Sequence, residues 1–518
     1  MIALRAQADA GVSQRLREAD LEPIAALAEQ EIHAGRIPGA VILIGNEGKI
    51  VYRRAFGHRA LRPEKLPMTA DTIFDLASLT KVVATTTAVM QLVEEGKLRL
   101  EDPVARYWPE FTVNGKTDIS VRALLTHYSG LRPDLDTSVG WRGYDTALKL
   151  IVAEKPRFAA ETRFLYSDIN FAILGELIRR ISGLPLDVYC ARHIFIPLGM
   201  TDTGFNPAPA QHDRIAPTVY RHREMQFGVV HDPTAYRMGG VAGHAGLFST
   251  ADDLARFAQM LLDGGSANGV RILRATTVAE MTRPQSPPRQ MRLRGLGWDL
   301  DTSSATDHQE LWHGDVYGHT GFTGTSLWVD PASRTYVIIL TNRVHPDGKG
   351  DVQPLRKRVA QVVATALGSP AVESETVLTR EGVRGKVESG IDVLAAEQFA
   401  PLAGLRVGLI TNHTGLDAAG RRTLELLHRA PNVKLAAIFS PEHGLYGNVD
   451  EKVASGVEPI TALPVYSLYG SARRPTAEMI AGLDALVFDI QDVGVRFYTY
   501  ITTMAYAMEA AAKKGVAF

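Results

Sequence analysis

The sequence contains one cysteine, Cys190, among its 518 residues. A single cysteine excludes an internal disulfide, and a buried, unreactive thiol is the expected state of Cys190. The sequence also lacks a run of about 18 apolar residues, so no membrane span is predicted. Residues 1–10 have one arginine but no apolar stretch leading to a cleavage site, and they do not predict a signal peptide. The sequence as it stands predicts a cytoplasmic protein, or a periplasmic one if the natural N-terminus is longer.

An excess of charge of either sign is missing as well. Lys and Arg number 56, Asp and Glu number 57, and the net charge is −1. Without a basic block or an acidic tail, nucleic acid and anionic membranes are not expected partners. His313 and His319 lack partners at metal-ligand spacing, so neither a metal nor another cofactor is predicted. The length predicts two or three structural units and leaves the oligomeric state open.

Apolar runs at the two ends of residues 1–368 predict a shared sheet. Runs at 40–45 and 49–56 flank the turn Asn46-Glu47-Gly48, and runs at 325–330 and 335–341 flank residues 331–334. Helical patterns cover residues 16–35 and 352–367. The pattern predicts one antiparallel sheet built from both ends, a helical subdomain inserted between them, and a cleft between the two lobes.

The middle of this region carries further landmarks. Residues 171–181 predict an amphipathic helix, and residues 249–253 predict the start of a helix that runs to Leu262. Residues 124–131 are interpreted as a structural loop after a short helix. The glycine-rich residues 239–246 lack the surroundings of a phosphate-binding loop and predict a close-packed turn.

The pattern changes after a predicted linker at residues 369–385. Strand-like runs then alternate with helical patterns, at 406–411, 418–428, 433–439, 476–482, 485–489 and 500–514. This alternation predicts a parallel α/β domain over residues 386–518. The chain ends at residues 515–518, as the next strand is expected to begin, so this domain is predicted to be partial.

The stretch Ser78-Leu79-Thr80-Lys81 is the centre of the chemistry predicted for the first domain. A nucleophilic serine needs a base within hydrogen-bond reach and a place for the developing oxyanion. Three residues apart on a helix, Ser78 and Lys81 share a face, and the first turn offers unpaired N–H groups. A Ser-x-x-Lys match alone is weak and more often marks only a helix start with a solvated lysine. Here Tyr166-Ser167-Asp168 and His319-Thr320-Gly321 follow in the order that serine penicillin-recognising hydrolases use.

These motifs resemble those of the class C β-lactamase, DD-peptidase and esterase superfamily. The matching stretches are residues 78–81, 124–131, 166–168, 197–200, 246–252 and 319–321. The resemblance implies a β-lactamase/transpeptidase-like α+β fold in which Ser78 is acylated and Lys81 and Tyr166 transfer the proton. Either the Lys81 ammonium favours a Tyr166 phenolate, or the pKa of Lys81 is depressed enough to accept the Ser78 proton. The resemblance also implies substrate contacts by four further residues, Asp168, His319, Thr320 and Gly321, and an oxyanion hole formed by the amides of Ser78 and Phe322.

Two departures from the β-lactamase pattern bear on the substrate. Asp168 stands where asparagine is usual, and an acid there attracts Lys81 and repels a substrate carboxylate. His319 replaces a lysine, so a permanent cation gives way to a group that is largely neutral at pH 7. Both departures favour peptidase or esterase activity over β-lactamase activity.

Acidic side chains follow two strands of the predicted second domain. Glu442 and His443 follow the strand at 433–439, and Asp489 and Asp492 follow the strand at 485–488. In a parallel sheet both loops lie at the carboxyl edge, and two carboxylates at one crevice suit a glycosidase. These residues could instead only cap helices or loops. Three nearby residues, Arg496, Tyr498 and Tyr500, are expected to contact a sugar.

Residues 411–415, 440–444, 464–470 and 489–500 resemble the NamZ family of exo-β-N-acetylmuramidases. The resemblance implies the Rossmann-like N-terminal lobe of that family and release of N-acetylmuramic acid from peptidoglycan ends. It implies that Glu442 is the catalytic acid and that His443, Asp489, Asp492 and Arg496 support it.

Together the two resemblances predict a bifunctional hydrolase that acts on peptidoglycan fragments. The first domain is expected to cleave a D-amino-acid peptide or an ester, and the second to release the sugar. Two alternatives stay open: an esterase of small molecules, and a β-lactam-sensing or wall-binding protein with negligible turnover.

Overall fold

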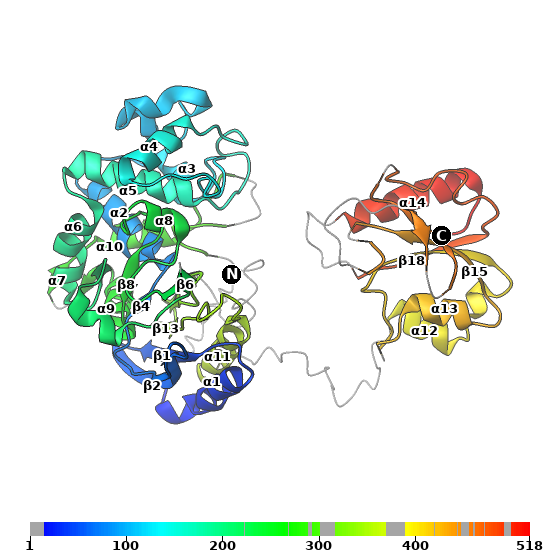
Figure 1. The fold of residues 1–518 in the computed structure, drawn as a ribbon, viewed down its shortest axis with the longest axis horizontal. Coiled ribbons are helices and arrows are strands. Elements are labelled where there is room, and N and C mark those ends of the chain that lie inside the picture. The colour runs from blue at the N-terminus through cyan, green and yellow to red at the C-terminus, as the bar shows by residue number, and fades with distance from the viewer. Residues whose placement is uncertain are drawn as a thin grey trace, which may run out of the picture. The chain divides into compact units, whose positions relative to one another are not determined.

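The computed structural model describes most of two units of the chain. The described residues are 15–221, 223–267, 269–288, 293–300, 316–368, 389–418, 420–442, 444–446, 455–458, 461–470, 472–491 and 499–518. The chain divides into one unit at Met1–Ser374 and a second at Glu375–Phe518 (Figure 1). The predicted linker at residues 369–385 lies outside the described residues. Within the described ranges, no helix is both long and apolar enough to cross a lipid bilayer.

The predicted sheet from the two ends of the first unit is present. It is antiparallel, with the strand order β11-β12-β13-β1-β2-β3. The strands are β1 (Gly39–Asn46), β2 (Lys49–Ala60), β3 (Leu66–Pro67), β11 (Tyr317–Thr320), β12 (Ser326–Asp330) and β13 (Thr335–Leu340). Strand β1 lies between β13 and β2, with Val41 opposite Leu340 and Ala55. Both predicted hairpins are confirmed.

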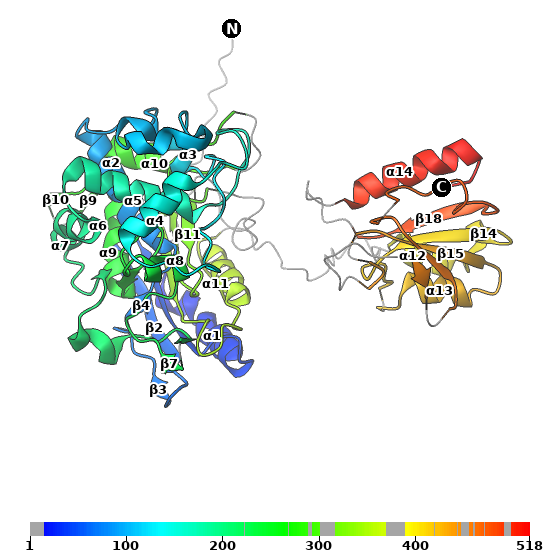
Figure 2. The ribbon, with the colours of Figure 1, turned by 45° about the horizontal axis from the view of Figure 1, so that its top comes forward.

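Strand β1 is buried on both faces, because alternate side chains enter different cores. Ile42 and Ile44 pack in a core with helices α1 (Pro23–His33) and α11 (Gln353–Ala366). Val41 and Leu43 face the larger core of the helical subdomain. The sheet therefore separates one helical layer from another, and Figure 2 shows α1 and α11 on the side away from the main group of helices.

The helical subdomain fills the region between the two ends of the sheet. Its helices are α2 (Thr87–Glu94), α3 (Val121–Leu125), α4 (Tyr144–Ala153), α5 (Asp168–Ser182), α6 (Leu186–Cys190), α7 (Ile196–Leu198), α8 (Pro233–Arg237), α9 (Ala251–Leu262) and α10 (Ala275–Thr282). A small antiparallel sheet β4-β8-β5 joins β4 (Phe74–Asp75), β8 (Leu247–Ser249) and β5 (Gly204–Phe205). Two short hairpins pair β6 (Tyr220–Arg221) with β7 (Glu224–Met225) and β9 (Ser266–Ala267) with β10 (Val270–Arg271). Cys190 is buried, as expected.

Two predicted helices in this unit have other boundaries. The helix expected at 16–35 begins only at Pro23, after a short 3-10 turn at Glu18–Leu21. Proline has no N–H to donate, so it suits the first position of a helix better than its interior. The helix expected from residue 171 begins at Asp168, which places that carboxylate in the first turn.

The second unit contains a five-stranded sheet with the order β16-β17-β15-β14-β18. The strands are β14 (Arg406–Thr411), β15 (Lys434–Ser440), β16 (Gly456–Val457), β17 (Pro464–Ser467) and β18 (Ala485–Asp489). The β14–β15, β14–β18 and β15–β17 pairs are parallel, as predicted, whereas β16 is antiparallel. The helices are α12 (Gly390–Ala396), α13 (Thr423–Arg429) and α14 (Tyr500–Lys514). Ala517 forms a parallel bridge with Ala485, the first residue of β18.

Two helix predictions in this unit need correction. Residues 476–482 form turns rather than a helix, since so short a segment gains few internal hydrogen bonds. The helix expected at 418–428 begins at Thr423, because Arg421 is held in a turn by two hydrogen bonds from its N–H groups to Asp417.

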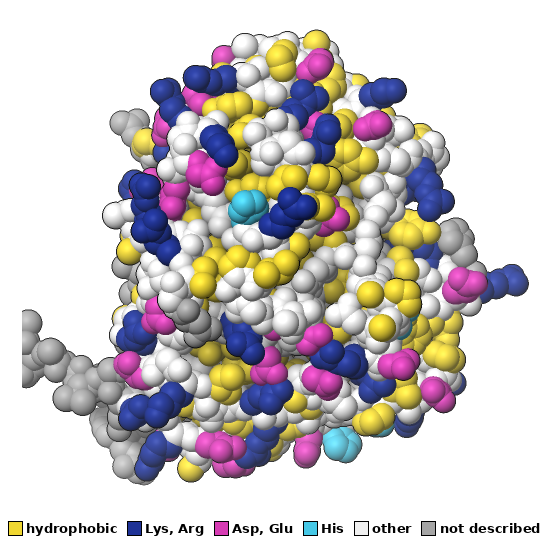
Figure 3. Space-filling model, turned by 90° about the vertical axis from the view of Figure 1, so that its left-hand side faces the viewer, with side chains coloured by type: hydrophobic (Ala, Val, Ile, Leu, Met, Phe, Trp, Pro, Cys, Tyr) yellow, Lys and Arg dark blue, Asp and Glu magenta, His cyan; other side chains and the backbone are white. Residues whose placement is uncertain are grey.

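Charge is spread evenly on the face shown in Figure 3. Lysine and arginine side chains alternate there with aspartate and glutamate side chains, and no large patch of one sign is visible. This distribution agrees with the net charge of −1.

Candidate active site

The nucleophile turn connects β4 to the helical segment that leads into α2. Ser78 follows Ala77, whose φ of +46° is rare for a residue with a Cβ atom. The chain then turns through a π-helical segment, Lys81–Thr86, before α2 begins. One turn of this helix brings the Lys81 Nζ atom within 2.8 Å of Ser78 Oγ. The predicted contact between these two side chains is present.

Lys81 is fully buried and is held by three oxygen atoms. Its Nζ atom lies 2.8 Å from Ser78 Oγ, 2.6 Å from Asp168 Oδ1 and 3.1 Å from the carbonyl oxygen of His244. Burial alone would lower the pKa of Lys81, but the Asp168 charge and the Tyr166 phenol raise it above its usual value. The Asp168 carboxylate therefore favours the charged form of Lys81, and the choice between Lys81 and Tyr166 as the base stays a prediction.

Tyr166 completes a three-residue cluster with Ser78 and Lys81. Lys81 Nζ lies 5.0 Å from the centre of the tyrosine ring. Burial raises the pKa of Tyr166, while the Lys81 charge and hydrogen bonds with Lys81 and Ser78 lower it in part. The ring of His127 stacks on Tyr166 with centroids 4.3 Å apart. The loop at 124–131, interpreted as structural, therefore supports a side chain of the site.

Strand β11, at the edge of the sheet, carries the His319-Thr320-Gly321 motif to the same place. A Cβ atom on Gly321 would lie 2.4 Å from the carbonyl oxygen of Leu76, so only glycine allows this approach to the nucleophile turn. His319 is buried, and burial lowers its pKa to about 3. Its Nδ1 atom lies 2.8 Å from the carbonyl oxygen of Thr320, which makes Nδ1 the donor of a neutral imidazole. Burial of His319 agrees with the neutral imidazole expected at this position, and its role in substrate binding stays a prediction.

A cavity of about 550 Å³ opens in front of these residues. Its lining includes all of the predicted first-unit residues except Lys81 and Asp168, together with side chains that the sequence did not single out: Asp299, Arg343, Asp351, Val352, Gln353 and Arg356. Phe322 is 61% exposed at the cavity, with the Arg343 guanidinium 4.5 Å from its ring centre. The roles of the Ser78 and Phe322 amides as oxyanion donors stay predictions.

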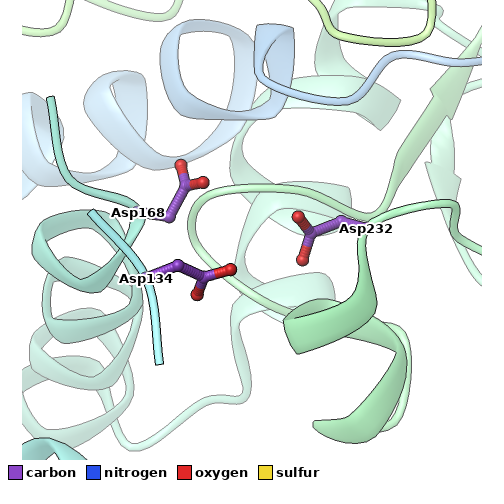
Figure 4. Close-up of side chains that lie close together, drawn as sticks. All are labelled: Asp134, Asp168 and Asp232. Atoms are coloured by element: carbon purple, nitrogen blue, oxygen red, sulfur yellow. The ribbon is translucent and has the colours of Figure 1, made fainter. Parts of the chain in front are cut away.

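Three carboxylates gather behind Lys81. Figure 4 shows the side chains of Asp134 and Asp168 beside each other and that of Asp232 pointing toward them, and the candidate ligand atoms lie within 4.8 Å of one another. His244 Nε2 lies 2.9 Å from Asp232 Oδ1. Burial would raise the pKa of Asp232, but the nearby His244 lowers it to about 2. Lys81 thus pairs with Asp168, and His244 with Asp232.

Titration of His319 is expected to make folding depend on pH. Its folded pKa lies below the unfolded value, so its contribution is full above pH 6.5 and is lost as the pH falls toward 3. Between pH 7 and pH 5 we expect His319 to reduce the free energy of unfolding by about 2 kcal/mol. Urea unfolding of the wild type and His319→Gln at both pH values measures this loss. The control His33→Gln changes an exposed histidine and should keep the wild-type pH dependence of the free energy of unfolding. If His319→Gln also keeps that dependence, His319 is not its source.

In the second unit, Glu442 and Asp489 lie at the carboxyl edge of the sheet. Glu442 follows β15 and accepts a hydrogen bond from Thr499 Oγ1 at 2.6 Å. Asp489 ends β18 and accepts a hydrogen bond from Thr423, and burial raises its pKa. Since β14 lies between β15 and β18, the two carboxylates lie on either side of one strand.

The other predicted residues of this site differ in outcome. His443, Asp492 and Arg496 lie outside the described residues, as does Tyr498. Tyr500 is only 3% exposed at the start of α14, so the expected sugar contact of its ring is wrong. An aromatic residue in the first turn of a helix can pack inward, and the sequence carries no signal of which way it points.

Comparison with known families assigns both units. The family described as Beta-lactamase matches residues 24–361. The family described as Exo-beta-N-acetylmuramidase NamZ, N-terminal, matches residues 407–518.

Individual relatives match the first unit. A protein of Escherichia coli K12, provisionally named a D-alanyl-D-alanine carboxypeptidase, is 32% identical over 353 residues, which are 61% of this chain and 80% of the relative. The N-acetylmuramyl-L-alanine amidase of Bacillus subtilis 168 is 32% identical over 374 residues, which are 64% of this chain and 82% of the relative.

Solved structures show the same fold at lower identity. The hydrolase EstCE1, which has promiscuous acyltransferase activity, has a TM-score of 0.56 and 24% identity over 67% of this chain and 99% of its own. A penicillin-binding protein homologue from Caulobacter crescentus has a TM-score of 0.56 and 23% identity over 68% of this chain and 98% of its own.

Proposed function

We propose that this chain, a member of the β-lactamase family of serine hydrolases, dismantles peptidoglycan fragments in two steps. Its second unit matches the N-terminal domain of the NamZ family. In the first step, the Ser78 unit cleaves the amide between the lactyl group of N-acetylmuramic acid and the first alanine of the stem peptide. In the second, the NamZ-like unit takes part in releasing the bare N-acetylmuramic acid. The observation that carries the first step is the contact of the Ser78 hydroxyl with the buried Lys81 ammonium and the Tyr166 phenol.

Acyl transfer at Ser78 uses the charged form of Lys81. Burial raises the pKa of Tyr166, and the Lys81 ammonium, held by Asp168, opposes this rise, so that the Tyr166 phenolate it stabilises can take the proton as the Ser78 oxygen attacks the amide carbon. The protonated phenol then gives that proton to the departing amine of the stem peptide. Water attacks the acyl-serine in the same manner, with Tyr166 again accepting and returning a proton, and frees Ser78.

The charges around Ser78 favour this amide over a D-alanyl-D-alanine bond. A terminal carboxylate next to the scissile bond needs a fixed cation, but His319 is neutral and Asp168 is an acid. The two arginines that line the cavity each donate to a backbone carbonyl. Arg356 donates to the carbonyl of Thr325 at 2.6 Å, and Arg343 donates to that of Gly350 at 2.8 Å.

The NamZ match supports the same order of reactions. An exo-muramidase acts on the sugar that the amidase would uncover, so the product of one site is the substrate of the other. The name of the Bacillus subtilis relative agrees with this assignment, whereas that of the Escherichia coli relative favours carboxypeptidase activity.

A pair of defined substrates tests the first step. N-acetylmuramyl-L-alanyl-D-isoglutamine contains the muramyl amide but no D-alanine, whereas diacetyl-L-lysyl-D-alanyl-D-alanine contains only the other bond. We expect mass spectrometry to detect release of L-alanyl-D-isoglutamine from the first and no D-alanine from the second. Release of D-alanine alone would assign a carboxypeptidase, and hydrolysis of p-nitrophenyl acetate alone would assign an esterase.

Replacing Asp168 by asparagine should change the substrate preference. We expect Asp168→Asn to raise the ratio of penicillin acylation to p-nitrophenyl acetate hydrolysis about tenfold, because a repulsive charge near the substrate carboxylate is removed. Taking a ratio cancels any general loss of Ser78 reactivity. The control Asp136→Asn makes the same change of charge at an exposed position and should leave the ratio unchanged. An unchanged ratio in Asp168→Asn would contradict the charge argument.

The activity of the second unit is tested with a para-nitrophenyl glycoside of N-acetylmuramic acid as the assay substrate. We expect its hydrolysis to be lost in Glu442→Gln but kept in Glu425→Gln, which changes an acid on α13 instead. Ser78→Ala should keep this activity. Equal rates in Glu442→Gln and the wild type would remove Glu442 from the proposal.

A further inference from the structure

The carboxylate of Asp75 joins two segments of the active site. Asp75 is 2% exposed and lies at the end of β4, just before the nucleophile turn. Its Oδ1 atom accepts the N–H of Ala77 at 2.9 Å, and its Oδ2 atom accepts the N–H of His231 at 2.7 Å. Burial raises the pKa of Asp75 to about 6, so at neutral pH the group is ionised and both oxygens accept hydrogen bonds.

The bond to Ala77 is made where the backbone is strained. Ala77 has a φ of +46°, which an alanine rarely adopts, and Ser78 is the next residue. A strained residue keeps such a conformation only when its surroundings hold it there. The Asp75 carboxylate supplies one such contact, and the carbonyl of Ala77 accepts another from Thr80 Oγ1 at 2.6 Å.

The main-chain carbonyls of Asp75 and Leu76 accept hydrogen bonds from the turn between β11 and β12. The carbonyl of Asp75 accepts the Thr323 hydroxyl at 2.7 Å, and that of Leu76 accepts the Thr325 hydroxyl at 2.9 Å. Thr323 follows Phe322, whose amide is a predicted oxyanion donor. The bond to His231 adds a third connection, because the His231 ring stacks on that of Phe322 at 5.5 Å.

We propose that Asp75 is the positioning residue that aligns Ser78 with the Phe322 amide, the second predicted oxyanion donor. This inference rests on the proposed acyl transfer at Ser78. Asp75 touches neither Ser78 nor the substrate. It holds the turn that presents Ser78 and the segment that carries the second donor, so its loss misplaces the two relative to each other.

The test uses intact mass to measure how fast a small fluorophosphonate labels Ser78. It also measures kcat and KM for N-acetylmuramyl-L-alanyl-D-isoglutamine (muramyl dipeptide). Asp75→Asn keeps the size of the side chain but replaces one acceptor by a donor, so one of the two N–H groups loses its partner. We expect the labelling rate and kcat to fall about 10- to 100-fold, while KM changes less than about threefold.

Two further variants separate positioning from general destabilisation. Asp253→Asn alters another buried carboxylate that accepts a backbone N–H, from Asp202, and should leave the labelling rate near that of the wild type. Adding Ala77→Gly to Asp75→Asn relieves the strain at position 77 and should restore at least part of the rate. If Asp75→Asn does not fold, Thr323→Val removes one of the two threonine hydroxyls that join the segments and should lower the rate in the same way.

The outcomes distinguish this inference from the function on which it rests. No labelling of the wild type would overturn the serine-hydrolase proposal and the inference with it. Normal labelling and kcat in folded Asp75→Asn, or in Thr323→Val where that variant replaces it, would overturn the inference alone. A loss in Asp253→Asn equal to that in Asp75→Asn would also overturn it, because the effect would then be general.

Discussion

Replacing Ser78 with alanine is expected to reduce muramyl-amide hydrolysis by a factor of at least about 10⁴. The Ser78 Oγ atom, the proposed nucleophile, lies 2.8 Å from Lys81 Nζ, whereas the Thr80 hydroxyl on the same turn donates to the carbonyl of Ala77. Steady-state rates with muramyl dipeptide measure the loss, and intact mass after treatment with penicillin or a fluorophosphonate should show an adduct on the wild type only.

The control for this variant is Ser138→Ala, which removes an exposed hydroxyl engaged only with Asp136 in the described contacts. It should keep the wild-type rate and the adduct. Because Ser78 and Lys81 act as a unit, Ser78→Ala combined with Lys81→Met should be no worse than Ser78→Ala alone. Residual turnover within tenfold of the wild type in Ser78→Ala would remove Ser78 as the nucleophile.

Replacing Lys81 with methionine is expected to have two large effects. Methionine fills a similar volume but has no charge, so the Tyr166 phenolate loses its stabilising partner and activity should fall about 10³- to 10⁴-fold. Asp168 loses the cation at 2.6 Å, and breaking such a buried pair should lower the free energy of unfolding by about 3–5 kcal/mol. Enzyme assays and urea unfolding measure the two effects separately.

A double variant shows which effect belongs to which contact. Adding Asp168→Asn to Lys81→Met removes the unpaired carboxylate, so stability should recover in large part while activity stays low. Lys116→Met is the matched control, because Lys116 is also fully buried but donates to the carbonyls of Val113, Val152 and Glu154. It should lose stability with little change in turnover per folded molecule. Activity that recovers together with stability in the double variant would contradict a chemical role for Lys81.

Much of the first unit follows from local sequence patterns. Strand β1 and strand β13 are strongly apolar and bounded by turns, so the sheet that joins them could be predicted. The Ser-x-x-Lys spacing fixes two side chains on one helical turn, and the order of the later motifs suggested the rest of the cluster. These features are local or follow one another along the chain, which is why the sequence alone reveals them.

The supporting contacts could not be predicted in the same way. Asp232 and His244 meet across α8, and Arg343 reaches the cavity from the loop after β13. Asp75 is bound to residues 156 and 248 positions away. None of these residues belongs to a repeating helical or strand pattern in the sequence. Each acquires its partner only when distant segments meet.

The misplaced helices have a related cause. Residues 476–482 have apolar positions at helical spacing but form turns, since a segment of this length depends on its neighbours for stability. The sequence indicates that a helix is present more reliably than it indicates where the helix begins, as Pro23 shows. It also does not indicate which way a side chain such as that of Tyr500 points.

The pairing of β1 with β13 sets the order in which the chain can fold during synthesis. Val41 meets Leu340 only after the whole helical subdomain has left the ribosome, so the central strand waits for a partner 299 residues away while one apolar face is uncovered. In the second unit β14 pairs with β15 fewer than about 30 residues later along the chain. We therefore expect slow closure and dependence on chaperones for the Ser78 unit, and faster formation of the β14–β15 pair in the second unit.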